Sequence, residues 1–175
     1  MLRFSKALLV VPPTGLYIRE DRCQTPIEEL VTVAPRPPID LMYIAAMLER
    51  EGVECRILDC PVEKKSWQDF ETILTDFAPG ALFICITTPT LSEDLLAASI
   101  AKRFDKSILT VAKGPHFHFR DQATLLKHPD LDMVIRGEYE ETAAELARDG
   151  DLDKIPGLTF RSERNFVRTQ ERAFV

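Results

Sequence analysis

The sequence predicts an α/β protein in which helices cover both faces of a parallel sheet. Five short apolar runs of strand length alternate with longer stretches that repeat apolar residues at helical spacing. The run at residues 81–86 is continuously apolar, as expected of a central parallel strand buried on both faces. With 175 residues, the chain is long enough for one domain with a sizeable core.

The first part of the predicted fold is a strand, a long loop, a helix and a second strand. Residues 7–11 form the first expected strand, and residues 12–38 form a polar loop with several prolines. A loop of that length is unusual in a compact domain and therefore indicates a function. The apolar face of residues 39–51 predicts a helix that ends at Gly52, and residues 53–58 follow as a strand.

Two capping signals mark the starts of the next helices. Ser66 with Asp69 is a variant of the capping box, and Thr90 with Glu93 fits the box itself. The first of these helices ends before Pro79, and the strand at residues 81–86 follows. The remaining elements are expected as helices at residues 90–104, 121–127 and 141–148, strands at 107–112 and 133–135, and a polar hairpin at 158–161 and 166–168.

Three loops at strand ends carry the candidate ligand-binding residues. Residues 87–90, 113–116 and 136–140 each follow an apolar run. Glycine at the end of a parallel strand lets another molecule approach the backbone, and open α/β sheets bind ligands at that edge. We therefore expect the three loops to build one slot. The alternative for Gly114-Pro115-His116 is a tight loop that binds nothing.

Charge and composition argue against several classes of function. The formal net charge of −6 disfavours a nucleic-acid partner, because phosphate binding requires a basic surface. The longest apolar runs are far too short to span a bilayer, and the first strand begins too early to leave room for a signal peptide. We expect no membrane association and a cytoplasmic location. The four cysteines form no C-x-x-C pair, which argues against a zinc or iron–sulfur site.

Individual residues give weaker support to other chemistries. The dinucleotide-binding pattern G-x-G-x-x-G is absent after the first strand. His116 and His118 form an H-x-H pair, but no cysteine or carboxylate partner follows at a suitable spacing. Thr87 stands where a phosphorylated receiver domain has its aspartate. Tyr17, in the long loop, is a candidate to cover a ligand or else an exposed aromatic residue.

The order and spacing of the motifs resemble the N-terminal cobalamin-binding domain of cobalamin-dependent radical S-adenosylmethionine enzymes. The resemblance covers nearly the whole chain and depends on the set of motifs rather than on any one of them. The segments that carry it are Val11-Pro12-Pro13, residues 38–48, residues 52–59, Thr87-Thr88-Pro89-Thr90, Gly114-Pro115-His116, Gly137-Glu138-Tyr139-Glu140 and residues 155–161.

This resemblance implies a flavodoxin-like (Rossmann-like) three-layer sandwich with a five-stranded parallel sheet, order 2-1-3-4-5, and a C-terminal hairpin tail. It implies a cobalamin-binding domain at residues 1–155, and a hairpin and linker at 156–175 leading to a catalytic domain beyond Val175. Cobalamin would lie across the carboxyl edge, with the dimethylbenzimidazole of its detached tail in the slot. The implied cofactor-binding residues are Pro13, Thr87, Thr88, Pro89, Thr90, Gly114, Pro115, His116, Gly137, Glu138, Tyr139 and Glu140.

The sequence departs from the family pattern at four points. The motif D-x-H-x-x-G is absent and residues 12–38 contain no histidine, so the resemblance implies cobalt without a protein His ligand. Lys113 stands where a glycine is usual, and its side chain is expected to fill the slot or to reach a phosphate. Tyr139 also replaces a usual glycine. No C-x-x-x-C-x-x-C occurs, so the parent enzyme's [4Fe-4S] cluster and S-adenosylmethionine are not expected on this chain.

Three hypotheses follow for the function. The first is a cobalamin-binding module of a radical S-adenosylmethionine enzyme, in which the corrinoid carries a methyl group or tunes radical chemistry; we expect no catalysis from this chain alone. The second is a cofactor-free Rossmann-like interaction or substrate-docking domain that has lost cobalamin, which Lys113 favours. The third is a small free-standing enzyme, although no set of acid, base and nucleophile can be named.

Overall fold

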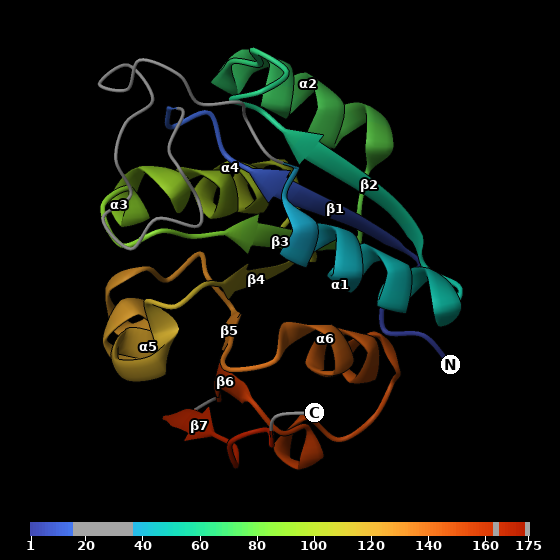
Figure 1. Cartoon of the computed structure of the whole chain (residues 1–175), viewed down its shortest axis with the longest axis vertical. Helices are drawn as coiled ribbons and strands as arrows, with labels where there is room; N and C mark the ends of the chain where they lie inside the picture. Colours follow the sequence, from blue (N-terminus) through green and yellow to red (C-terminus); the bar gives the residue numbers. More distant parts are fainter. Residues whose placement is uncertain (16–36, 163–164, 174–175) are drawn as a thin grey trace.

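The fold is a three-layer α/β arrangement in which a sheet lies between two layers of helices (Figure 1). The computed structural model describes residues 1–15, 37–162 and 165–173. Within these ranges the sheet has the order β2-β1-β3-β4-β5-β6-β7. The first five strands pair in parallel in the predicted order, which confirms the flavodoxin-like prediction. The sheet has seven strands rather than five, because the hairpin joins it antiparallel at β5.

The bounds of most helices and strands agree closely with those predicted from the sequence. The strands are β1 (Lys6–Val11), β2 (Glu54–Asp59), β3 (Ala81–Cys85), β4 (Leu109–Lys113), β5 (Met133–Ile135), β6 (Leu158–Arg161) and β7 (Phe166–Arg168). The helices are α1 (Ile39–Arg50), α2 (Trp67–Phe77), α3 (Leu91–Asp94), α4 (Leu96–Phe104), α5 (Phe117–Lys127), α6 (Tyr139–Ala147) and a 3-10 turn (Leu152–Lys154). The largest difference is at α5, which begins at Phe117 rather than at residue 121. Among the described helices, none is long and apolar enough to cross a membrane.

Two clusters of buried apolar side chains lie on opposite faces of the sheet. Successive residues of β1 alternate between them, so that Leu8 and Val10 face α2, α4 and α5, whereas Ala7 and Leu9 face α1 and α6. Because helices cover both faces, β1 and β3 are almost entirely apolar and buried. This layering leaves the ends of the strands, rather than the faces of the sheet, accessible to a ligand.

The two predicted capping boxes have opposite outcomes. At α2 the box is present, since the Asp69 N–H donates to Ser66 Oγ at 3.2 Å and the Ser66 N–H donates to Asp69 Oδ2 at 2.8 Å. The prediction for Thr90 is wrong, because its hydroxyl donates to the Asp94 carboxylate at 2.6 Å and makes no cap. The helix predicted over residues 90–104 is divided into α3 and α4.

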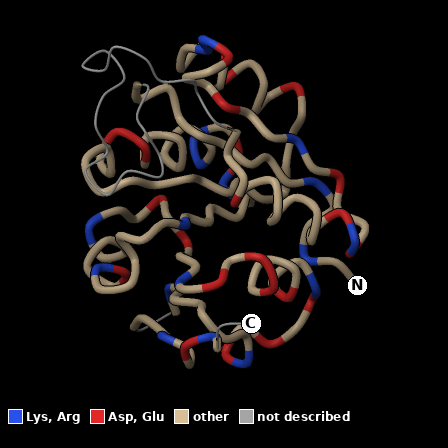
Figure 2. The backbone as a smooth tube through the Cα atoms, viewed as in Figure 1, with Lys and Arg blue, Asp and Glu red and all other residues tan. Residues whose placement is uncertain are grey.

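A buried arginine anchors the hairpin to the parallel part of the sheet. Arg136 follows β5, has no exposed side-chain surface, and donates through Nη2 to the carbonyls of Leu158 (3.1 Å) and Thr169 (2.7 Å). Its guanidinium also pairs with Glu171 and lies 3.6 Å from the buried carboxylate of Asp121 in α5. Figure 2 shows acidic and basic residues interleaved along this part of the chain. The hairpin therefore packs as part of the same α/β body.

Replacing Arg136 with alanine is expected to lower the free energy of unfolding by about 3 kcal/mol or more, because buried carbonyl and carboxylate groups lose their partner. Urea denaturation of the purified chain measures the change. Arg148→Ala is a matched control, because Arg148 pairs with Glu51 at the surface with 59% of its side chain exposed. The control should change stability far less, and equal effects of the two substitutions would contradict a structural role for the buried cluster.

Candidate functional site

The carboxyl ends of β1, β3 and β4 lie side by side and form one edge of the sheet. Cys85 pairs with Lys113, and Val11 follows Val10, which pairs with Ile84. The three strands therefore end together, and the loops that follow them begin at neighbouring points. We call this edge, formed by Val11, Cys85, Lys113 and the loops that follow, the rim. Lys113 is the last residue of β4 rather than a loop residue as predicted.

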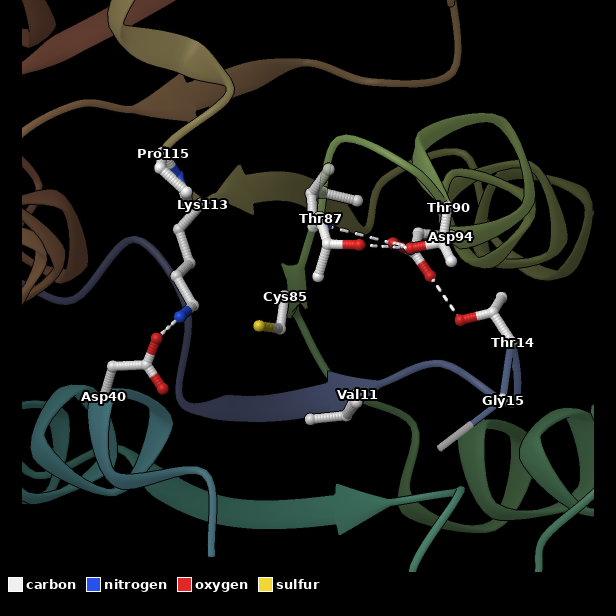
Figure 3. A pocket seen from close by; sticks show the side chains of 11 residues that line it. Val11, Thr14, Gly15, Asp40, Cys85, Thr87, Thr90, Asp94, Lys113 and Pro115 are labelled. Carbon is white, nitrogen blue, oxygen red and sulfur yellow. Dashed lines mark hydrogen bonds and ion pairs between the residues drawn. The ribbon is translucent and has the colours of Figure 1, made fainter. Parts of the chain in front are cut away.

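A pocket of about 110 Å³ opens at the rim, between α1 and the loops after β1, β3 and β4 (Figure 3). Its lining residues are Val11, Thr14, Gly15, Asp40, Cys85, Ile86, Thr87, Thr90, Asp94, Lys113 and Pro115. In Figure 3 the Lys113 and Asp40 side chains lie on one side, and the hydroxyl and carboxylate groups around Asp94 lie on the other. Val11 and Cys85 lie between the two polar groups. The pocket thus combines an apolar floor with two polar walls.

A buried carboxylate organises the first polar wall. Asp94 is 2% exposed and accepts hydrogen bonds from the hydroxyls of Thr14 (2.7 Å) and Thr90 (2.6 Å) and from the Thr87 N–H (3.2 Å). The Thr87 and Thr90 hydroxyls are also 2.6 Å apart. Burial raises the pKa of Asp94, and the three hydrogen bonds oppose that rise. Asp94 therefore ties the loop after β1 to the loop after β3 and fixes the width of the pocket.

An ion pair forms the second polar wall. Lys113 is 2% exposed, and its ammonium pairs with the carboxylate of Asp40 in the first turn of α1. The ammonium also lies 5.1 Å from the centre of the Tyr139 ring at the start of α6. Burial raises the pKa of the Tyr139 hydroxyl to about 12. Lys113 thus points to the face covered by α1 and α6, whose first turns supply its partners.

Gly114 is required by the packing of the rim itself. Its φ is +151°, and a Cβ at this position would lie 2.3 Å from the carbonyl oxygen of Ile86. The close approach that the sequence assigned to a ligand is therefore made by the backbone after β3. In contrast, a Cβ on Gly137 would meet nothing within 4 Å, although its φ of +70° also favours glycine.

His116 is part of the rim but is engaged by neighbouring hydroxyls. Its Nδ1 lies 3.3 Å from Thr88 Oγ1 and its Nε2 lies 3.3 Å from Thr124 Oγ1. Burial, followed by the charge of Arg120, lowers the pKa of His116. Among the described residues, no group of three or more His, Cys, Asp or Glu side chains could hold a metal ion.

The structure brings only some of the predicted residues to the pocket. Thr87, Thr90 and Pro115 line it, and Gly114 does not line it but packs against the backbone of Ile86, which does. The other predicted residues do not line the pocket: Pro13, Thr88, Pro89 and His116 belong to the loops of the rim, whereas Gly137 and Glu138 follow β5 and Tyr139 and Glu140 begin α6. Tyr17 and Cys23 fall outside the described residues.

Several residues that line the pocket were not predicted from the sequence. Asp94 and Asp40 are the important ones, since each supplies the carboxylate of one polar wall. Thr90 and Asp94 are one helical turn apart, and this spacing is the signal that could have indicated Asp94. No pattern indicates Asp40, because its contact with Lys113 joins residues that are distant in the sequence.

The fold is Rossmann-like, and folds of this class commonly bind ligands at the carboxyl ends of the strands, where this pocket opens. Residues 31–147 match the family model described as the B12 binding domain. Since this match covers more than half of the chain, the chain belongs to the B12-binding domain family. B12 is cobalamin, so cobalamin is the ligand that family membership supports.

Similar proteins are longer than this chain. An uncharacterized methyltransferase of Pyrococcus horikoshii is 31% identical over 173 residues, which cover 97% of this chain and 35% of that protein. The anaerobic magnesium-protoporphyrin IX monomethyl ester cyclase of Synechocystis is 26% identical over 76% of this chain and 28% of its own length. The radical S-adenosylmethionine methyltransferase TsrM of Kitasatospora setae, solved with cobalamin and a [4Fe-4S] cluster, has a TM-score of 0.72 at 20% identity, over 98% of this chain and 30% of its own. The chain thus spans about a third of these proteins.

Gly114→Ala is expected to destabilise the fold by about 2–4 kcal/mol, because the new Cβ collides with a backbone oxygen that cannot move aside. Gly137→Ala is the matched control, since it shares a positive φ but has open space, and should cost about 1 kcal/mol. Thermal and urea unfolding of both variants measure the difference. Equal costs would show that the Ile86 contact does not constrain the rim.

Stability should depend on the protonation of Asp94. Because its pKa is raised on folding, the folded chain binds this proton more tightly than the unfolded chain. The free energy of unfolding should therefore fall as pH rises from the ordinary carboxyl range through the raised pKa. Urea titrations from about pH 4 to pH 8 should show this fall in the wild type and a weaker one in Asp94→Asn. An unchanged pH profile in the Asn variant would contradict the assignment.

Proposed function

We propose that this chain holds cobalamin at the rim and that the pocket receives the ring at the end of the cofactor's nucleotide tail. The observation that carries the proposal is the position of the pocket at the joined ends of β1, β3 and β4, in a chain of the B12-binding domain family. When bound, the corrinoid supplies cobalt chemistry such as the carriage of a methyl group.

The size and lining of the pocket support this assignment. Its volume of about 110 Å³ suits one ring system, since pockets for drug-sized ligands measure roughly 300–1,000 Å³. The macrocycle would therefore remain outside, above the loops at residues 87–90, 114–116 and 137–140. In this assignment Thr87, Thr90 and Pro115 contact the tail ring, and the other predicted residues face the rest of the cofactor.

We also propose that no histidine of this chain coordinates cobalt. Residues 12–38, which follow β1, contain no histidine. His116, the histidine of the rim, has a hydroxyl within 3.3 Å of each ring nitrogen. A cobalt ligand would have to give up one of these contacts.

The whole protein is proposed to be a radical S-adenosylmethionine enzyme in which a further domain, C-terminal to Val175, binds the [4Fe-4S] cluster and S-adenosylmethionine. The chain spans 35% of the methyltransferase and 30% of TsrM, which leaves room for such a domain. Methyl transfer is the reaction that both names carry, so it is the reaction class we propose. The division into residues 1–155 and 156–175 remains a prediction.

One observation favours a second function. The buried Lys113 and its partner Asp40 occupy a wall of the pocket, where the family pattern has a glycine. A domain that had lost cobalamin and kept the fold for docking would be compatible with this. That alternative requires corrinoid to bind Lys113→Gly and not the wild type.

Filling the pocket should abolish binding. Val11 is half-buried at the end of β1 and lines the pocket, so Val11→Trp places an indole in the space proposed for the tail ring. Hydroxocobalamin is added to the chain, unbound corrinoid is removed by gel filtration, and retained corrinoid absorbance is measured. The wild type should retain corrinoid, and Val11→Trp should retain at least about tenfold less.

Val62→Trp is the matched control, because Val62 is 43% exposed and does not line the pocket. Its retention should equal that of the wild type. A colourless wild type would overturn the proposed function, and equal retention by both tryptophan variants would overturn the assignment of the pocket.

A further inference from the structure

The hydrogen bonds around Asp94 run in one direction. An ionised carboxylate only accepts hydrogen bonds, so the hydroxyls of Thr14 and Thr90, which lie 2.7 and 2.6 Å from it, each donate their single hydrogen to Asp94. The Thr87 and Thr90 hydroxyl oxygens are 2.6 Å apart, a distance that requires a hydrogen between them. Because the Thr90 hydrogen is already donated to Asp94, the hydrogen between the two threonines belongs to Thr87.

All three hydroxyl hydrogens of the first polar wall are therefore held within the protein. A hydroxyl oxygen that donates its hydrogen still has two lone pairs with which it can accept. Among the described residues, no group donates a hydrogen bond to Thr87 Oγ1 or to Thr14 Oγ1. These two side chains can accept hydrogen bonds from a ligand, and they have no hydrogen left to donate.

Thr87 and Thr14 are placed to present these lone pairs to a ligand. Both line the pocket and are half-buried, whereas Thr90 and Asp94 are only 5% and 2% exposed. Figure 3 shows the two threonines on the same side of the pocket as Asp94, which joins the loops that carry them. A ring that fills the pocket therefore meets hydrogen-bond acceptors from two loops along this wall.

We infer that Thr87 and Thr14 make the pocket selective for a corrinoid whose tail base carries a hydrogen-bond donor on its ring, such as a hydroxyl, over one with a methyl group at the same position. The inference rests on the proposed function, because it assumes that the pocket receives the tail ring. A hydroxyl donates to one of the two oxygens, whereas a methyl group covers them and leaves their lone pairs unsatisfied. Cobalamin, whose base carries two methyl groups, still binds, but as the weaker ligand.

Two cobamides that differ in one group test the selectivity. Their lower bases are 5-hydroxybenzimidazole and 5-methylbenzimidazole, which carry a hydroxyl and a methyl group of similar size at the same ring position. Dissociation constants for the 175-residue chain are measured by equilibrium dialysis at about pH 8, above the ordinary range of carboxyl pKa values. Cobinamide, which lacks the nucleotide tail, is the third ligand. The wild type should bind the hydroxyl cobamide about tenfold more tightly than the methyl cobamide.

Replacing either threonine with valine removes the hydroxyl and keeps the shape of the side chain. Thr87→Val and Thr14→Val each remove one acceptor, so the hydroxyl preference should fall to about threefold or less in at least one of them. The second variant tests the wall even if the first does not fold. Thr75→Val is the matched control, because Thr75 is exposed on α2, does not line the pocket, and donates its hydroxyl hydrogen to the Glu71 carbonyl at 2.8 Å. It should keep the wild-type preference.

The outcomes separate the two proposals. If the wild type binds no corrinoid, cobinamide included, the proposed function fails and the selectivity fails with it. If the wild type binds the two cobamides equally tightly, or if both pocket variants keep the full hydroxyl preference, only the selectivity is overturned.

Discussion

The parallel pairing of β1, β3 and β4 in matched register is the constraint on which the site depends. Because Val10 is level with Ile84, and Cys85 with Lys113, three loops from distant parts of the sequence begin at one edge. A shift of one residue in any strand would turn its last side chain to the other face of the sheet. Lys113 would then point away from Asp40 and α1. In this register the side chains of the strands pack into the two apolar clusters on opposite faces of the sheet.

The loops that leave this edge are held by contacts between backbone and buried polar groups. Gly114 lets the end of β4 approach the Ile86 carbonyl, and Asp94 accepts hydrogen bonds from both the β1 and the β3 loop. Buried polar groups of this kind are rigid, because moving one leaves several others unsatisfied. The pocket is therefore largely formed before any ligand arrives, which lowers the entropic cost of binding.

The sequence predicts the elements of this fold better than the side chains of its site. A short apolar run indicates a strand directly, which is why β5 was predicted with its observed bounds, and the hairpin pattern of the polar C-terminal segment gave the bounds of β6 and β7. The antiparallel pairing of β6 with β5 was not predicted, because no local pattern shows which strand accepts a hairpin. Thr90 was misassigned since a hydroxyl at a helix start can cap it or bond one turn ahead, and only the burial of Asp94 decides.

Among the described residues, the buried charged clusters around Arg136 and around Lys113 differ in their surroundings. Arg136 is held by the carbonyls of Leu158 and Thr169 and by the carboxylates of Glu171 and of Asp121 in α5. The ion pair of Lys113 and Asp40 instead borders a cavity. Enclosing that wall under an apolar ligand would cost desolvation, whereas a ligand with matching donors and acceptors would replace the water. A charge pair at a cavity therefore bears on the chemistry of a ligand, whereas the cluster that joins Arg136 to α5 and to the end of the hairpin bears on the fold.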